Sequence, residues 1–302
     1  MQVSASAASV SVGDARRWRW YALAPALTIY LLLALLPIAN LLAMSVHDIR
    51  WVEGEARWTY AGFRHFAELP RDPLFRAGLF NTAGFAALAV AAEMVIGFFL
   101  ALFVSRVVAG RVVYRTIFLL PILIPGIVIG AIWKLMYNPD FGVINQLFGA
   151  VGLAGRDWLG DPALALASVV VVDIWHWTPF VFLLLLAGLE SLPQDVFEAA
   201  KMDGASAWAE LRYLTFPMML PALAVTLVFR LIVSFKVFDE VYLLTGGGPG
   251  TATEVVSFTI YRRFFTEDRM GYGSAISVVA LFLLTLVIVV GLAASRRRAQ
   301  AA

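Results

Sequence analysis

Apolar residues in this chain are grouped into long continuous stretches, and polar residues are gathered between them. None of the stretches shows the polar/apolar alternation of a barrel strand, so the pattern predicts helices. A bilayer core about 30 Å thick is crossed by roughly 20 helical residues. The stretches of that length, each expected to be one membrane-spanning helix, are 21–44, 81–104, 116–136, 163–187, 220–238 and 274–294.

The first stretch is too long for a secretion signal, whose apolar region covers about 7–15 residues. We therefore expect an uncleaved helix, in which Pro25 and Pro37 are tolerated because neighbouring helices can satisfy the freed carbonyls. The loops between the stretches are too short for a soluble domain. The sequence thus predicts one all-α membrane domain of six spans over 21–295, preceded by a tail at 1–20 and followed by a basic tail at 296–302.

The composition agrees with a membrane protein and excludes several other classes. Of the 302 residues, 61% are hydrophobic and 15% are charged, whereas soluble domains are about 45–50% apolar and about 25% charged. A formal net charge of +2 provides no basic face for nucleic acid. The absence of cysteine excludes disulfides, thiol catalysis and zinc–thiolate sites, and three histidines argue against a His-rich metal cluster.

Basic residues near the span ends indicate the orientation. Both sides of the membrane receive similar numbers of arginines, but only on one side do they directly adjoin the spans, at Arg17, Arg19, Arg115 and 296–298. The positive-inside rule therefore places both termini in the cytoplasm. The outer loops are then 47–80, 137–162 and 241–273, and the inner loops are 105–115 and 188–219.

The second inner loop contains the most informative motif, SLPQDVFEAAKMDGASAWAELRYLTFPMMLP, over 191–221. Ser191 followed three residues later by Gln194 predicts a capping box at the start of a short helix. Gly204 is suited to the left-handed position that ends such a helix. A second helical piece is expected from about Ser206, followed by Pro217 at the entrance to the fifth span.

The charge of this loop indicates whether it contacts lipid headgroups or a protein. One interpretation is that it only connects two spans along the lipid headgroups, but a helix at the lipid interface is typically rich in Lys and Arg. This loop is acidic instead, and a short amphipathic helix offered to a groove is a recurring mode of protein recognition. The acidic residues are Glu190, Asp195, Glu198, Asp203 and Glu210.

The same loop resembles the EAA loop of bacterial ABC importer permeases. Glu198-Ala199-Ala200 is followed after three residues by Gly204 and after nine more by 214–217, whereas the family pattern ends in Ile-x-Leu-Pro. The chain has Leu214 and Phe216 at the two apolar positions of that ending. Other segments resemble the carbohydrate-uptake branch and its MalF-like half, namely 138–142 (NPDFG), 175–180 (WHWTPF) and 245–249 (TGGGP).

The resemblance implies a MalF/MalG-like type I importer fold, placed in a bacterial inner membrane. It also implies a second homologous permease, two cytoplasmic ATPases and an extracytoplasmic solute-binding protein as partners, with ATP bound by the ATPases and no cofactor on this chain. The solute would be a sugar, an oligosaccharide or a polyol. The residues that would couple the ATPase to transport are Glu198, Ala199, Ala200, Asp203 and Gly204.

Ionisable residues inside the spans are candidates for a solute site, because such groups face the bundle interior or a wet cavity. Asp173, His176, Trp177 and Phe180 share one face of the fourth span, and a second stripe follows the fifth span. Aromatic rings would stack on a sugar and polar groups would meet its hydroxyls. In the MalF-like branch the translocation site comes from these spans. The fifth-span stripe is Arg230, Val233, Ser234 and Val237, and Lys236 and Asp239 complete the expected substrate-binding set.

Structural interpretations remain open for each of these groups. Lys236 and Asp239 can pair with each other or with Asp173, and His176 can be a satisfied core histidine. Glu93 is alone in the second span, and we interpret it as a packing contact or a contact with a partner helix, not as a solute ligand. The family commonly has Asn where this chain has Lys236, which leaves room for a solute with a negative group.

Two other function classes compete with the ABC importer permease. A secondary transporter driven by an ion gradient would use Glu93, Asp173 or Asp239 and often shows repeat symmetry, which we do not detect here. A membrane-embedded enzyme would need clustered catalytic groups, and no acid–base pair or triad stands out. The 246–250 glycine run reads as a turn with a secondary role in contacting the binding protein. Because the chain has no Gly-x4-Gly-Lys-Ser/Thr loop, we expect that it does not itself hydrolyse ATP.

Overall fold

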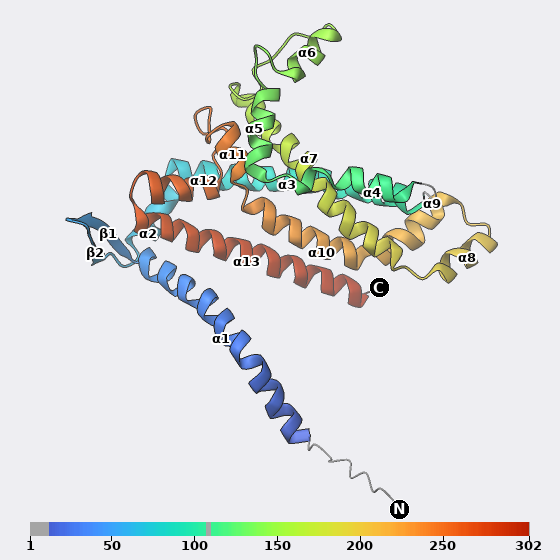
Figure 1. Ribbon diagram of the computed structural model, residues 1–302, viewed down its shortest axis with the longest axis horizontal. Coiled ribbons are helices and arrows are strands. Elements are labelled where there is room, and N and C mark those ends of the chain that lie inside the picture. Colours follow the sequence, from blue (N-terminus) through green and yellow to red (C-terminus); the bar gives the residue numbers. More distant parts are fainter. Residues whose placement is uncertain (1–11, 107–109, 302) are drawn as a thin grey trace, which may run out of the picture.

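The computed structural model describes residues 12–106 and 110–301, so the first eleven residues of the expected N-terminal tail lie outside it. Helices make up most of the described chain, with one two-stranded hairpin (Figure 1). The elements are α1 (Val12–Ser45), β1 (His47–Val52), β2 (Glu55–Tyr60), α2 (Arg64–Glu68), η1 (Leu69–Arg71), α3 (Pro73–Arg106), α4 (Arg111–Leu119), η2 (Pro121–Leu123), α5 (Gly126–Met136), α6 (Val143–Ala150), α7 (Pro162–Glu190), α8 (Gln194–Met202), α9 (Ala207–Glu210), η3 (Leu211–Thr215), α10 (Phe216–Phe235), α11 (Asp239–Leu244), α12 (Val256–Tyr261), η4 (Arg262–Thr266) and α13 (Met270–Ala301).

Five segments of the described chain are helical, long and apolar enough to cross a membrane. They coincide with five of the six expected spans, which confirms those helices. The fourth of them joins α9, η3, α10 and α11 and has breaks within it. The segments are Trp20–Ser45, Pro73–Arg106, Pro162–Glu190, Ala207–Leu244 and Met270–Gly291.

The remaining expected span, 116–136, is not one helix, and that prediction is wrong. The chain forms α4, the single turn η2 and then α5, with a change of direction between them (Figure 1). Pro121 and Pro125 explain the break, because proline lacks the N–H of the helix ladder and its ring collides with the preceding turn. Ile124, just before Pro125, is extended, as residues before proline prefer.

The centre of the bundle is formed by α3, α7 and α10, which pack closely together. Small residues allow this approach: a Cβ added to Gly97 of α3 would lie 2.7 Å from a Val181 methyl of α7. Gly188 is similarly tight against Ala222 and Met219, on the α7–α10 contact. Helix association in membranes depends on such close packing, since lipid supplies little hydrophobic drive.

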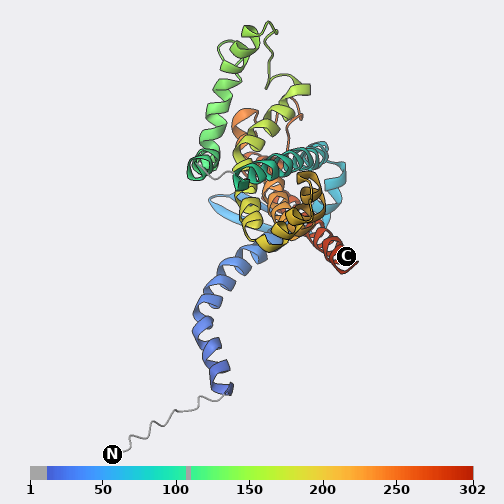
Figure 2. The ribbon, with the colours of Figure 1, turned by 90° about the vertical axis from the view of Figure 1, so that its right-hand side faces the viewer.

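Helix α1 contacts α13 and β1 but otherwise stands apart from the bundle. In two perpendicular views it leaves the body near the hairpin and extends away from the other helices (Figures 1 and 2). None of its most apolar window is buried within the chain. Because an apolar helix bare on all sides needs lipid or another protein around it, this chain by itself is an incomplete unit.

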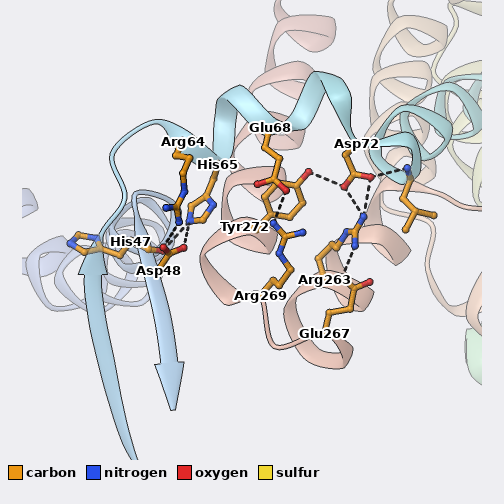
Figure 3. A network of polar contacts seen from close by, with 11 residues as sticks. His47, Asp48, Arg64, His65, Glu68, Asp72, Arg263, Glu267, Arg269 and Tyr272 are labelled. Carbon is orange, nitrogen blue, oxygen red and sulfur yellow. Dashed lines mark hydrogen bonds and ion pairs between the residues drawn. The ribbon is translucent and has the colours of Figure 1, made fainter. Parts of the chain in front are cut away.

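One group of ion pairs joins the hairpin to α2, and a second joins the start of α3 to η4 and the start of α13 (Figure 3). In the first group, Asp48 of β1 accepts from Arg64 of α2, and the Nε2 of buried His65 lies 3.2 Å from the other Asp48 oxygen. His65 also contacts the carbonyl of His47 at 3.3 Å. These contacts fix how the chain turns from α1 into the hairpin.

The second group is centred on Asp72, immediately before α3. It accepts from Arg263 at 2.8 and 2.9 Å, from Tyr272 Oη at 2.8 Å and from the backbone N–H of Leu74 at 2.9 Å (Figure 3). Burial alone would raise the pKa of Asp72, but the hydrogen bond from Tyr272 and the charge of Arg263 hold that pKa below its usual value. Arg263, in turn, donates to Glu267 at 2.5 Å.

The acidic loop forms two short helices, α8 and α9, far from the hairpin (Figure 1). The predicted capping box is wrong: Ser191 donates to the Gly188 carbonyl at 2.8 Å, and Pro193 takes the N-cap position of α8. The prediction for Gly204 is confirmed, because its φ is +77° and the next N–H bonds back to Ala200 at 2.9 Å.

Candidate functional site

The polar stripes of the fourth and fifth spans meet in a buried charge cluster between α3, α7 and α10. The Nη2 of Arg230 donates to Asp173 Oδ2 at 2.7 Å and to Glu93 Oε1 at 2.6 Å, and its Nε donates to the other Glu93 oxygen. All three side chains are at most 2% exposed. We call this group the buried triad. Glu93, expected to make a packing contact, is thus the partner of the arginine.

The triad shows which residue pairs with Asp173, a point that the sequence left open. Asp173 pairs with Arg230, not with Lys236 or Asp239, and Arg230 has no exposed surface from which to reach a solute. Burying a charge is costly unless it is paired and hydrogen-bonded, which explains why two carboxylates surround one guanidinium. The Nη1 of Arg230 remains buried without a hydrogen-bond partner.

Aromatic side chains cover the triad on one side. The guanidinium carbon of Arg230 lies 5.0 Å from the ring centre of Trp177, a cation–π distance. Trp177 in turn contacts Phe180 edge-on, with ring centres 6.0 Å apart. Both rings are half-buried, so part of each faces away from the chain. The triad therefore fixes the position of an aromatic surface that is accessible from outside the subunit.

His176 is paired with a residue that the sequence did not identify. Its Nδ1 lies 3.2 Å from Glu240 Oε1 in α11, and both side chains are buried. The pair joins α7 to α11 inside the chain. Glu240 lies in the first turn of α11, just beyond the expected end of the fifth span at 238, and its place next to Asp239 was the one signal for it.

The two remaining charged candidates, Lys236 and Asp239, are exposed at the break between α10 and α11. Within the described residues they form no ion pair with each other. A Cβ on Gly126 would lie 3.0 Å from Asp239 Oδ2, which places this carboxylate at the start of α5. Of the other stripe residues, Ser234 and Val237 are buried, and Val233 is half-buried.

The EAA-type loop lies at the far end of α7 and α10 from these charges (Figure 1). Glu198, Ala199, Asp203 and Gly204 are exposed, and Ala200 is half-buried. Two ion pairs tie the flanks of the loop to the bundle: Arg106 of α3 to Glu210 at 3.5 Å, and Arg115 of α4 to Glu190. The loop thus presents an exposed face while its flanks are attached to α3 and α4.

Among the described residues no group of three or more His, Asp or Glu side chains could hold a metal ion. The side chains that the site brings together offer hydrogen bonds, ring faces and charge. These are the means by which proteins bind polar solutes without a covalent step.

Comparisons with known proteins agree with this geometry. Residues 93–299 match the family described as "Binding-protein-dependent transport system inner membrane component". The trehalose/maltose transport system permease protein MalF of Thermococcus litoralis is 36% identical over 275 residues, covering 91% of this chain and 92% of that protein. The probable starch degradation products transport system permease protein AmyD of Thermoanaerobacterium thermosulfurigenes is 31% identical over 93% of this chain and 94% of that protein.

A solved structure extends the agreement to the fold. A chain of a bacterial alginate ABC transporter, crystallised with an alginate pentasaccharide-bound periplasmic protein, superposes with a TM-score of 0.82 at 25% sequence identity. The match covers 94% of this chain and 96% of that chain. Together with the family match over residues 93–299, these likenesses show that the chain belongs to the family of binding-protein-dependent inner membrane components, the permease subunits of ABC importers.

Proposed function

We propose that this permease imports a sugar, an oligosaccharide or a polyol together with a second, homologous permease. Two ATPases would drive the cycle from the cytoplasm, where both termini lie, and an extracytoplasmic binding protein would deliver the solute. The chain would itself hydrolyse no ATP and carry no cofactor. The named relatives support the solute class, since their descriptions refer to trehalose, maltose, starch products and alginate.

The observation that carries the proposal is the exposed face of α8. The exposed Glu198 and Ala199, on a loop whose flanks are ion-paired to α3 and α4, suit a lever between a cytoplasmic motor and the bundle. Small alanines allow close approach, and Glu198 can accept a charge-assisted hydrogen bond. Asp203 and Gly204 would complete the contact, with the glycine allowing the chain to turn into α9.

The transport site would use the stripe residues in two different roles. The half-buried Trp177, Phe180 and Val233, with the exposed Lys236 and Asp239, would contact the solute. The buried groups, by contrast, would position them. Those positioning residues are Asp173, His176, Arg230, Ser234 and Val237, and Glu93 and Glu240 act with them.

Uptake into proteoliposomes tests the proposal. The complete transporter would be reconstituted with its binding protein, and import of radiolabelled maltose, trehalose and sorbitol would be followed. We expect import of at least one of these that requires ATP and persists when a protonophore and a sodium ionophore abolish ion gradients. Import that stops with the gradients and ignores ATP would instead support the secondary transporter.

The Trp177→Ala variant then tests the site itself. We expect it to lower the import rate by an order of magnitude while the subunits still assemble, because it removes the aromatic surface above the triad. Trp51→Ala is the matched control, since Trp51 is an exposed tryptophan of β1, outside both the triad and the α8–α9 loop. Equal rates in the two variants would remove Trp177 from the solute path.

A further inference from the structure

A polar cavity lies remote from α8. It has a volume of about 350 Å³ and is bounded by the end of α5, the loop before α7 and the glycine turn after α11. We call it the outer pocket and define it by Lys134, Asn138, Asp157, Thr245 and Gly248. Two of the sequence segments singled out above, NPDFG at 138–142 and TGGGP at 245–249, thus meet at one cavity although a hundred residues separate them.

The first wall of the outer pocket is a hydrogen-bonded loop rather than an open one. Asn145 of α6 donates to the carbonyls of Pro139 and Arg156 at 3.1 and 2.9 Å, and its oxygen accepts from Trp158 Nε1 at 2.8 Å. Beneath it, Tyr137 is buried and donates to the carbonyl of Ser168 at 3.1 Å. The pocket is therefore formed before any ligand arrives, which lowers the entropic cost of binding.

The second wall is the glycine turn, and its shape is also fixed. The hydroxyls of Thr245 and Thr253 lie 2.6 Å apart, and Asn81 of α3 donates to the carbonyls of Thr251 and Glu254 at 2.8 and 2.9 Å. At Gly247, where φ is +84°, an added Cβ would lie 2.5 Å from buried Glu254. A side chain there would push the turn off its neighbours, so glycine is required.

The groups that line the outer pocket have unused hydrogen-bonding capacity of both kinds. No carboxylate in 12–106 or 110–301 pairs with exposed Lys134. Asp157 gives one oxygen to the N–H of Gly160 at 2.9 Å and has its second oxygen free. Asn138 uses its oxygen for two backbone N–H groups and keeps its amide N–H₂ to donate.

Such a lining suits a neutral, hydroxyl-rich ligand. An ammonium and an amide donate while a carboxylate accepts, and each sugar hydroxyl can do both. An anion would meet Asp157 and a cation would meet Lys134, so neither is favoured. The volume lies at the lower end of the range for ligand pockets, about 300–1,000 Å³, which limits the occupant to a small unit.

We propose that the outer pocket is a second solute site, which holds one sugar unit on the extracytoplasmic side before it reaches the aromatic surface at Trp177. This inference rests on the proposed carbohydrate specificity. Its consequence is that the permease would bind free solute weakly by itself, separately from the binding protein and from the transport step.

Solute protection of a single cysteine tests the proposal, because the chain has no cysteine of its own. Pro139→Cys places a thiol on the rim of the pocket, in the assembled transporter without binding protein or nucleotide. The rate of maleimide labelling is measured with glucose, maltose or trehalose present. We expect at least one sugar to slow labelling several-fold, while labelling of Glu55→Cys at the hairpin tip is unchanged.

Two further variants separate a solute site from general effects. Asp157→Asn keeps the acceptor for Gly160 but turns the free oxygen into a donor, and we expect protection to weaken several-fold. Asp161→Asn is the matched control, since Asp161 caps α7 outside the pocket, and protection should persist. Trp177→Ala should also keep protection while losing import, which distinguishes failure of this site from failure of the proposed function.

Two results would overturn the outer pocket as a solute site. No protection by any of the sugars would overturn the outer pocket while leaving ATP-driven import intact. Protection that appears only when binding protein is added, with or without sugar, would also overturn it, because the pocket would then be covered by a protein surface.

Discussion

At the scale of single residues, one buried arginine organises the centre of the bundle. Arg230 of α10 joins Glu93 of α3 and Asp173 of α7, and the face of Trp177 lies against it. The sequence predicted that Asp173 and Arg230 belong to one site, because each is a rare charge on an apolar helix. It did not predict Glu93 as their partner, since a contact across 137 residues depends on how three helices pack.

Neutralising Glu93 and neutralising Arg230 should have different effects on stability. Two carboxylates face one guanidinium, so Glu93→Gln leaves a balanced pair with Asp173 and should reduce stability little. Arg230→Met leaves both carboxylates buried without their partner, which we expect to cost about 3–5 kcal/mol. Thermal unfolding in detergent, followed by tryptophan fluorescence, measures both. Similar midpoints for Arg230→Met and the unchanged protein would contradict a role for the triad in stability.

The Asp72 cluster should make the protein sensitive to acid. Because the pKa of Asp72 is lower when folded than the usual value of about 3.9, its ion pairs stabilise the fold at neutral pH. That stabilisation is lost as the pH falls below 3.9 and through the folded pKa.

The Asp72→Asn variant isolates this contribution. We expect it to unfold at a lower temperature than the unchanged protein at pH 7, and the difference should shrink as the pH approaches 3. Asp140→Asn is the matched control, because Asp140 is exposed and its side chain makes no described contact. A difference for Asp72→Asn that stays constant from pH 7 to 3 would contradict the assignment.

At the scale of elements, helix extents were predictable wherever apolar residues ran unbroken, and breaks were less so. The 116–136 stretch has the composition of a span, yet Pro121 and Pro125 divide it into α4, η2 and α5. The same prolines were visible in the sequence, but Pro25 and Pro37 lie inside the continuous α1. The presence of proline alone did not decide the outcome. In α4–α5 two prolines four residues apart remove successive ladder bonds, whereas in α1 they are far enough apart for the helix to continue.

Close helix contacts at glycine give a prediction at this scale. A side chain at Gly130 of α5 would meet Leu243 of α11 at 2.8 Å, so Gly130→Val should separate these helices and cost about 1–3 kcal/mol. Gly149→Val, in α6, is the control because nothing lies within 4 Å of its Cβ position. Thermal unfolding and import are both measured. Normal import and stability in Gly130→Val would show that α5 and α11 need not pack closely.

At the scale of the whole molecule, the fold separates three surfaces. The hairpin lies remote from α8, and α1 extends away from the bundle (Figures 1 and 2). The EAA spacing identified the family from the sequence, because it is a local motif. The free α1 was not predictable, since an apolar helix has the same pattern whether its neighbours belong to its own chain or to another.

The account depends most on the claim that α8 is where an ATPase acts on this permease. Cross-linking tests it directly, with Ala199→Cys as the attachment point for a thiol-to-lysine reagent in the assembled, transporting complex. We expect a covalent product with the ATPase subunit from Ala199→Cys and none from Glu55→Cys at the hairpin tip. An assembled transporter that still imports solute while the thiol at position 199 never joins the ATPase would contradict the account.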